Sequence, residues 1–429
     1  MTPISSLPLG RLVMSLVVAV LAAGRVAGVD EPRPWPPDQF VPVTAERIAA
    51  LPAAEQPAWR AYWNASVERA RLLSPNRDLV DHSSTKRLDG PPIPSIYSHG
   101  VRLGAPAEWY ASEAARVIAD HVAQWQTVVG GWVKSGDYSR AREPKDDHHD
   151  AWSSGTFDND STIFELRFLA LVATAAGDSE RARGWRESFL RGLDYVLAAQ
   201  YPNGGFPQVY PLVGWYHDAI TFNDDAMEHA LELLRDVSER KPEYAFVPAS
   251  LAAEAGQRLE RGLQCVLAAQ LRNAAGELTG WGQQHDPLTL QPCAARNFEP
   301  IGECSKESAS LLQFLMTLPN PSPEIVRATA AGIAWLNRKA LHDVTWNRDD
   351  THRSGLVAAP GAPLLWARLY EPGTGKPIFG ERDRVIHYVF GELTNERRRG
   401  YGWYGTWPQA ALDAYRDWPA KLTSPAPGR

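Results

Sequence analysis

Two short polar segments of the sequence carry residue types that could bind a metal ion. The segment 156–160 (Thr-Phe-Asp-Asn-Asp) recurs at 221–225 (Thr-Phe-Asn-Asp-Asp). Aspartate and asparagine ahead of a helix often only cap its free N–H groups, and capping alone is one interpretation. It accounts for one acid per segment, whereas each segment holds two acids and an amide. Since Ca²⁺ prefers such oxygen ligands, we favour a cation or catalytic site with Asp158, Asp224 and Asp225 as candidate ligands.

Arginines near these segments could hold a substrate that carries carboxylates. A weaker third copy of the polar motif is predicted at 296–299 (Arg-Asn-Phe-Glu), with Arg296 as its first residue. Arg368 and Arg382 follow later in the chain. A planar guanidinium binds a carboxylate through two parallel hydrogen bonds. Metal-binding acids surrounded by arginines therefore predict a site for an acidic polymer, such as a uronic-acid polysaccharide.

The segments that position these residues are helices that repeat along the chain. Residues 191–200 and 261–270 are nearly identical, and they end in Gln200 and Gln270. A loop with glycine and an aromatic residue follows each glutamine, as it also follows Gln126. A period of about 70 residues with two helices per unit predicts a closed ring of helical hairpins, an α/α toroid, or else an open solenoid. In a ring, the polar loops would meet at one rim.

The expected fold class is therefore all-α, an incomplete α/α toroid with irregular loops and short strands. Helix starts are predicted at Thr162 and Glu165, which have the spacing of a capping box, and at Ser322-Pro323. The chain has sixteen tryptophans. The aromatic residues of the repeated loops, Trp132, Phe206 and Trp281, could stack on sugar rings or pack in the core.

The N-terminus has the features of an export signal. Arg11 precedes the apolar run 12–23, and small residues at 26–28 suit cleavage. The run is short for a membrane span, although a retained anchor is the alternative. We expect residues 1–28 to be removed and the protein to be secreted, in the periplasm or outside the cell, with no stable membrane insertion.

Four segments are expected along the chain. They are the signal peptide (1–28), a proline-rich lead-in with N-terminal helices (29–106), the catalytic toroid (107–418) and a flexible tail (419–429). The formal net charge of −6 over 429 residues gives no reason to expect a nucleic-acid partner. We expect a monomer whose partner is its polysaccharide substrate.

The three cysteines, Cys265, Cys293 and Cys304, have a spacing that suits neither a zinc site nor a cysteine nucleophile. In an oxidising compartment one pair could form. Because they lie close in the sequence, Cys293 and Cys304 are the predicted pair. The chain also lacks a serine-hydrolase elbow, a phosphate-binding loop and a dinucleotide fingerprint.

Several motifs together resemble the pectate lyases of polysaccharide lyase family 10. They occur in the family's order within residues 45–418, at 201–211, 221–227, 284–286, 295–299, 365–368, 382–383 and 400–405. The resemblance implies an incomplete α/α toroid and Ca²⁺-dependent cleavage of polygalacturonate by β-elimination.

The resemblance also implies roles for individual residues. Arg296 matches the arginine that serves as Brønsted base, and Asp158 matches an active-centre aspartate near calcium and substrate. Asp224, together with Asp225, matches the main calcium-binding acid. The candidate substrate-binding residues are Lys134, Trp281, Arg368 and Arg382.

The implied reaction begins with Ca²⁺ on the uronate carboxylate, which acidifies the neighbouring C5 proton. Arg296 would remove this proton as the C4 oxygen departs. Arginine is normally charged, so this role requires burial, cationic neighbours or alkaline conditions. One alternative is an inverting glycoside hydrolase that uses Asp158 and Asp224 as acid and base, about 6.5–9.5 Å apart. A polysaccharide-binding protein without activity is the other.

Overall fold

A computed structural model describes residues 31–35, 40, 42–73, 100–143, 154–349 and 354–423. The predicted export signal and the end of the predicted tail lie outside these residues. From Pro32 onward the chain forms one compact unit. Helices predominate and the strands are two or three residues long, which confirms the all-α fold class. None of the described helices is long and apolar enough to cross a membrane.

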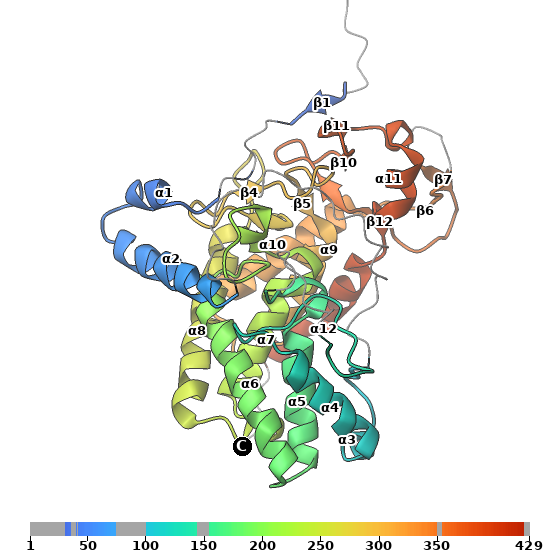
Figure 1. Cartoon of the computed structure of the whole chain (residues 1–429). Coiled ribbons are helices and arrows are strands. Elements are labelled where there is room, and N and C mark those ends of the chain that lie inside the picture. Colours follow the sequence, from blue (N-terminus) through green and yellow to red (C-terminus); the bar gives the residue numbers. More distant parts are fainter. Residues whose placement is uncertain are drawn as a thin grey trace, which may run out of the picture. The chain divides into compact units, whose positions relative to one another are not determined.

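The central helices form two layers of hairpins (Figure 1). One layer consists of α5 (Ile163–Ala175), α7 (Ala226–Ser238) and α9 (Ser305–Met316). The other consists of α4 (Glu113–Trp125), α6 (Glu180–Ala199), α8 (Ala249–Ala269) and α10 (Pro323–Lys339). Each hairpin pairs one helix of each layer, because α5 packs on α6, α7 on α8 and α9 on α10. Within the first layer, α7 contacts both α5 and α9.

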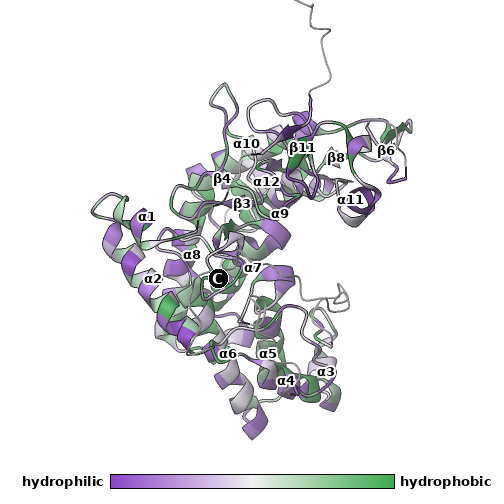
Figure 2. Ribbon diagram, turned by 45° about the horizontal axis from the view of Figure 1, so that its top comes forward, coloured by the Kyte–Doolittle hydropathy of each residue, from purple (hydrophilic) through white to green (hydrophobic). Residues whose placement is uncertain are grey.

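Further helices lie around this repeat. They are α1 (Ala45–Ala49), α2 (Gln56–Arg71), α3 (Ala107–Tyr110), α11 (Asn395–Gly400) and α12 (Pro408–Thr423). Hydrophilic and hydrophobic residues alternate along α2, as expected for a helix with one buried side (Figure 2). That side packs on the repeat, since the Tyr62 hydroxyl donates to the Ala199 carbonyl at 2.9 Å. The helix α12 packs on α9 and α10.

Short antiparallel strands brace the loops. The three-stranded sheets are β1-β11-β10 (Arg33–Pro34, Val385–His387, Phe379–Gly380) and β2-β3-β4 (Ile220–Thr221, Gln284–His285, Pro292–Cys293). The pairs are β5-β9 (Glu303–Cys304, Leu369–Tyr370), β6-β7 (Val344–Trp346, Leu356–Ala358) and β8-β12 (Trp366–Ala367, Tyr404–Gly405). Single 3₁₀ turns lie at Tyr216–Asp218, Pro242–Tyr244 and Phe390–Glu392.

The repeated glutamines join consecutive hairpins. The Gln200 amide donates to the Gly204 carbonyl of its own loop at 2.9 Å and to the Arg258 carbonyl of α8 at 2.8 Å. Gln126 bonds in the same way to its own loop and α6, and Gln270 to its own loop and α10. The glutamine is repeated because in each unit its side chain joins the loop after its own helix to the middle of the next helix in the same layer.

Replacing Gln200 by alanine is therefore expected to destabilise the fold by about 1–3 kcal/mol, because it removes both buried hydrogen bonds that join the loop to α8. Urea unfolding of the purified protein measures this. Gln56→Ala is the matched control, since Gln56 also donates to two carbonyls, but at a more exposed site where water can replace it. Equal effects of the two substitutions would contradict the role of Gln200.

The aromatic residues of the repeated loops belong to the core. The Trp132 indole donates to the Val122 carbonyl at 2.7 Å, and the Trp281 indole donates to the Val266 carbonyl at 2.8 Å. Both side chains are fully buried, and so is Phe206. The prediction that Trp281 binds substrate is therefore wrong, because no face of its ring is open to a sugar.

A fourth loop of this kind, which the sequence comparison missed, contains Trp366. Its indole donates to the Leu336 carbonyl near the end of α10, at 2.8 Å. The backbone of Leu341 pairs with Leu365 beside it, through hydrogen bonds of 2.8 and 3.1 Å. The glutamine of the other copies is replaced here by Ala340, and the longer connection hides the repeat in the sequence.

Candidate active site

The two polar segments form matching turns ahead of α5 and α7. Residues Asp158–Asp160 and Asn223–Asp225 each make a 3₁₀ turn, and the two turns contact each other. Asn159 and Asp224 share a positive φ (49° and 50°), and Asp160 and Asp225 share a second (63° in both). Asp158 is therefore equivalent to Asn223, not to Asp224. Left-handed residues cost of order 1–3 kcal/mol each and tend to cluster at functional sites.

Backbone hydrogen bonds identify the third copy of the turn. The amides of Thr156, Thr221 and Cys304 donate to the carbonyls of Trp132, Phe206 and Trp281, at 3.0, 3.0 and 2.7 Å. The third copy therefore begins at Cys304, and the predicted copy at 296–299 is wrong. It escapes detection because α9 begins directly at Ser305, without the 3₁₀ turn of the other copies.

The same comparison corrects the predicted capping box. The Thr162 hydroxyl accepts a hydrogen bond from the Trp132 amide at 3.0 Å and makes no cap. Glu165 accepts instead from the Tyr138 hydroxyl at 2.8 Å. Both side chains fasten the loop to the helix that follows it. The other predicted start is confirmed, with Ser322 capping α10 ahead of proline.

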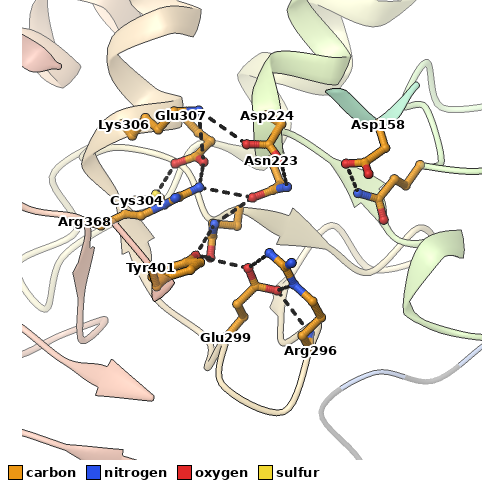
Figure 3. Close-up of polar contacts among 12 residues, drawn as sticks. Asp158, Asn223, Asp224, Arg296, Glu299, Cys304, Lys306, Glu307, Arg368 and Tyr401 are labelled. Atoms are coloured by element: carbon orange, nitrogen blue, oxygen red, sulfur yellow. Dashed lines mark hydrogen bonds and ion pairs between the residues drawn. The ribbon is translucent and has the colours of Figure 1, made fainter. Parts of the chain in front are cut away.

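Asp158 is an almost buried carboxylate in the site, with 3% of its side chain exposed. One oxygen accepts from the Gln208 amide at 2.9 Å, and the other is paired with the Lys134 ammonium. Burial raises the pKa of Asp158, and the Asp224 charge adds to this, while Lys134 and Arg296 oppose it. The predicted ligands Asp158 and Asp224 lie on turns that contact each other, and the charge of the predicted base Arg296 acts on Asp158 (Figure 3).

Arg296 lies on the loop between β4 and β5, facing Glu299. The Arg296 Nε donates to Glu299 Oε2 at 2.7 Å, the Nη2 donates to the second oxygen, and the backbone amide donates at 3.2 Å (Figure 3). Partial burial alone would lower the pKa of Arg296, but the Glu299 charge raises it above its usual value. Sequence reasoning included Glu299 only as an acid of the supposed third copy, although its i,i+3 spacing was a usable signal.

A polar network connects Glu299 to the second acidic turn. The Tyr401 hydroxyl donates to Glu299 at 3.1 Å, and the Gln283 amide donates to Tyr401 and to Asn223, at 3.0 and 2.8 Å. Arg368 also donates to Asn223, at 3.2 Å. The base candidate and Asp224, which accepts from the Asn223 amide at 2.7 Å, are therefore held in one polar network, whereas Asp158 bonds separately to Gln208 (Figure 3).

Two charged residues of α9, Lys306 and Glu307, were missed by the sequence analysis. The Lys306 ammonium lies 3.6 Å from Asp224 Oδ1, 3.8 Å from Asp225 Oδ1 and 3.7 Å from Glu307 Oε1. Glu307 is buried and bonded to Arg368 at 2.5 Å. Burial alone would raise the pKa of Glu307, but Arg368 and Lys306 lower it to about 2. The sequence carries no signal for either residue, because the third copy lacks the 3₁₀ turn that marks the other two.

The remaining arginine candidates occupy different surroundings. Arg382 is half-exposed and bonded to Glu396 by two hydrogen bonds of 2.9 Å. Its guanidinium lies 5.3 Å from the centre of the Phe298 ring, and that of Arg296 lies 4.9 Å from the same ring. Arg382 is thus exposed beside the base candidate, whereas Arg368 is buried beneath the acidic turns.

The predicted disulfide is wrong, because all three cysteines are buried as free thiols. The Cys304 thiol donates instead to the Glu307 carboxylate. Burial, followed by the nearby Glu307 charge, raises the pKa of Cys304 well above its usual value. The thiol is therefore part of the support for the site.

Comparison with known proteins agrees with this geometry. Residues 126–412 match the family model described as pectic acid lyase. A family 10 polysaccharide lyase from Cellvibrio cellulosa is 30% identical, with a TM-score of 0.63, over 75% of this chain and 99% of that one. A mutant of a lyase so described, solved with trigalacturonic acid, has the same identity and TM-score over 73% and 97%. No curated protein sequence matches the chain significantly. This chain therefore belongs to the pectic acid lyase family: it is a pectate lyase, and its fold is the incomplete α/α toroid.

Proposed function

We propose that this pectate lyase is secreted and cleaves polygalacturonate by β-elimination with the help of Ca²⁺. The observation that carries the proposal is that the turns of Asp158 and Asp224 contact each other, and that Asn223, Gln283 and Tyr401 connect the second turn to the Glu299 that binds Arg296. The similar lyase solved with trigalacturonic acid supports the substrate class. Membership of a lyase family leaves no ground for the hydrolase alternative. Secretion rests on the predicted signal at 1–28.

The acidic turns have the donor chemistry that Ca²⁺ requires. Beyond the Lys134 ammonium, Asp158 Oδ2 has no partner among the described residues. Among the described residues, Asp224 Oδ1 has only Lys306, at 3.6 Å, while Oδ2 accepts from the Asn223 amide at 2.7 Å. We assign Asp158 and Asp224 as calcium ligands, with Asp225 adding negative charge. A bound Ca²⁺ supplies positive charge that neutralises the uronate carboxylate and acidifies the proton at C5.

The side chains around the turns bind and orient the substrate. Arg382 and Lys134 are partly exposed cations and would contact uronate carboxylates. Arg368 is bonded to Glu307 and Asn223, so it would position the second turn. Only the edge of its guanidinium would reach the substrate. Each of these three cations then has a carboxylate partner: a uronate of the substrate for Arg382 and Lys134, and Glu307 for Arg368.

Arg296 acts as the base that takes the C5 proton, and it must first lose its own proton. Glu299 fixes the orientation of the guanidinium but also stabilises its charged form. The neighbouring charge of Arg382 opposes the charged form of Arg296. The balance predicts an enzyme whose activity rises toward alkaline pH, as the neutral form of Arg296 becomes more populated.

Replacing Glu299 by glutamine is expected to move the rising limb of the pH–activity profile to lower pH. Glu299 raises the pKa of Arg296, so removing the negative charge lowers that pKa and exposes the neutral base earlier. Initial rates on polygalacturonate across alkaline pH measure the shift. Glu371→Gln, at a carboxylate that pairs with Arg33 and Tyr388, is the matched control. A profile displaced to higher pH would contradict this role of Glu299.

A calcium titration tests the proposed function. Rates on polygalacturonate should fall to background in EDTA, return with added Ca²⁺ and be absent on a neutral polysaccharide. Rates unaffected by EDTA would overturn calcium assistance while leaving the family assignment intact. Normal rates on a neutral polymer would overturn the substrate assignment.

A further inference from the structure

Three side chains capable of binding a metal lie together at the start of α7. Asp225 immediately precedes the helix. Glu228 and His229 lie three and four residues after Asp225, which places all three on one side of the first turn. One ligand atom from each lies within 4.8 Å of the other two. The function proposed above uses neither Glu228 nor His229.

Glu228 is the member of this group whose chemistry is unexplained. The residue is only 8% exposed, and none of the described residues forms a hydrogen bond or ion pair with its carboxylate. Its electrostatic neighbours include the acids Asp225, Glu232 and Glu307. Because a largely buried carboxylate among other acids is unfavourable, a bound proton or a cation would stabilise Glu228.

Lys306, the nearby ammonium in the described part of the chain, does not supply that compensation. The Lys306 ammonium lies 3.6–3.8 Å from carboxylate oxygens of Asp224, Asp225 and Glu307, and these distances are too long for hydrogen bonds. It forms no ion pair with Glu228. One Asp225 oxygen is likewise buried without a hydrogen bond in the described part of the chain. The start of α7 therefore has an excess of unsatisfied negative charge.

His229 indicates which class of cation would be bound. Its Nδ1 lies 2.5 Å from Asp160 Oδ1, and a carboxylate beside the ring is the usual companion of a metal-bound imidazole. Imidazole combined with carboxylates favours first-row transition metals over the all-oxygen shell that suits Ca²⁺. The contact also connects α7 to the first acidic turn.

We propose that Asp225, Glu228 and His229 bind a divalent transition-metal ion, with Zn²⁺ as the probe, at a site separate from the calcium position between Asp158 and Asp224. The ion would compensate Glu228 and, through the His229–Asp160 contact, hold the first acidic turn against α7. Three protein ligands leave coordination positions for water. The assignment does not depend on the catalytic role of calcium.

Metal analysis of untagged protein tests the proposal. Chelator-treated enzyme is dialysed against Zn²⁺ with saturating Ca²⁺, and bound zinc is measured by mass spectrometry. Wild type should retain one Zn²⁺ per chain and gain thermal stability from it. Glu228→Gln and His229→Gln should bind it at least about tenfold more weakly. Glu232→Gln, the same change one turn further along α7, is the matched control and should bind like wild type.

The outcomes separate this site from the proposed function. Absence of stoichiometric zinc in wild type, or full zinc retention in Glu228→Gln, would overturn the proposal. Circular dichroism without metal verifies that each variant is folded. Glu228→Gln should fold normally, since a neutral amide replaces an unpaired carboxylate. Calcium-dependent lyase activity is measured in parallel, so that a failed calcium role and a failed zinc site give different results.

Discussion

Arg296→Ala is expected to lower kcat/KM on polygalacturonate by about 10²–10⁴-fold, the usual contribution of a positioned general base. The fold should survive, because 43% of the Arg296 side chain is exposed and its main contacts are Glu299 and Phe298 on the same loop. Initial rates of ultraviolet absorbance from the new double bond measure the loss. Tyr401 would still donate to Glu299, which limits the rearrangement.

Arg382→Ala is the control that separates a base from a binding residue. Arg382 lies beside the same Phe298 ring but is half-exposed and paired with Glu396. Its loss should raise KM more than it lowers kcat, because a substrate-carboxylate contact contributes to binding in both ground and transition states. If Arg296→Ala lost no more kcat than Arg382→Ala, Arg296 would not be the base.

Asp158→Asn is expected to raise the calcium concentration needed for half-maximal activity by at least about tenfold, since one charged ligand is removed from the metal site. Thermal stability without calcium should not fall. Burial raises the pKa of Asp158, so the ionised carboxylate costs folding free energy above the pKa of the unfolded chain. A neutral amide removes that cost, and its oxygen can still accept from Gln208. Calcium titration and thermal unfolding measure the two effects.

Asp236→Asn should behave in the opposite way. Burial alone would raise the pKa of Asp236, but Lys241 and Arg167 lower it below its usual value. Its ionised form therefore stabilises the fold above the pKa of the unfolded chain, and this stability is lost as pH falls through the folded pKa. The variant should unfold at a lower temperature with an unchanged calcium requirement. A lower calcium affinity in Asp236→Asn would contradict the ligand assignment, and so would an unchanged calcium affinity in Asp158→Asn.

The hairpin repeat was predictable because its signals are local. Gln126, Gln200 and Gln270 end their helices and bond to the nearest loop carbonyls, so their spacing records the period of the fold. Asp158 and Asp224 were found for the same reason, since each turn keeps its own composition. The copy that begins at Cys304 was not found, because it lacks the 3₁₀ turn and the paired acids.

Residues that act through partners distant in the sequence were harder to predict. Nothing local distinguishes Glu307 from an ordinary helix acid, and its partner Arg368 comes from another element. Trp281 was assigned to substrate because sugar stacking and core packing favour the same residue type. The Cys293–Cys304 pair was inferred from sequence proximity, which does not determine the direction of either side chain.

Product analysis tests the central claim most directly: calcium at Asp158 and Asp224 supports β-elimination with Arg296 as base. Unsaturated ends, measured by ultraviolet absorbance, and reducing ends are counted together for wild type with calcium, wild type with EDTA, and Arg296→Ala. The account predicts one unsaturated end per new reducing end in wild type with calcium, and neither product above background in the other two samples. Reducing ends without unsaturation, or undiminished unsaturation in EDTA or in Arg296→Ala, would contradict it.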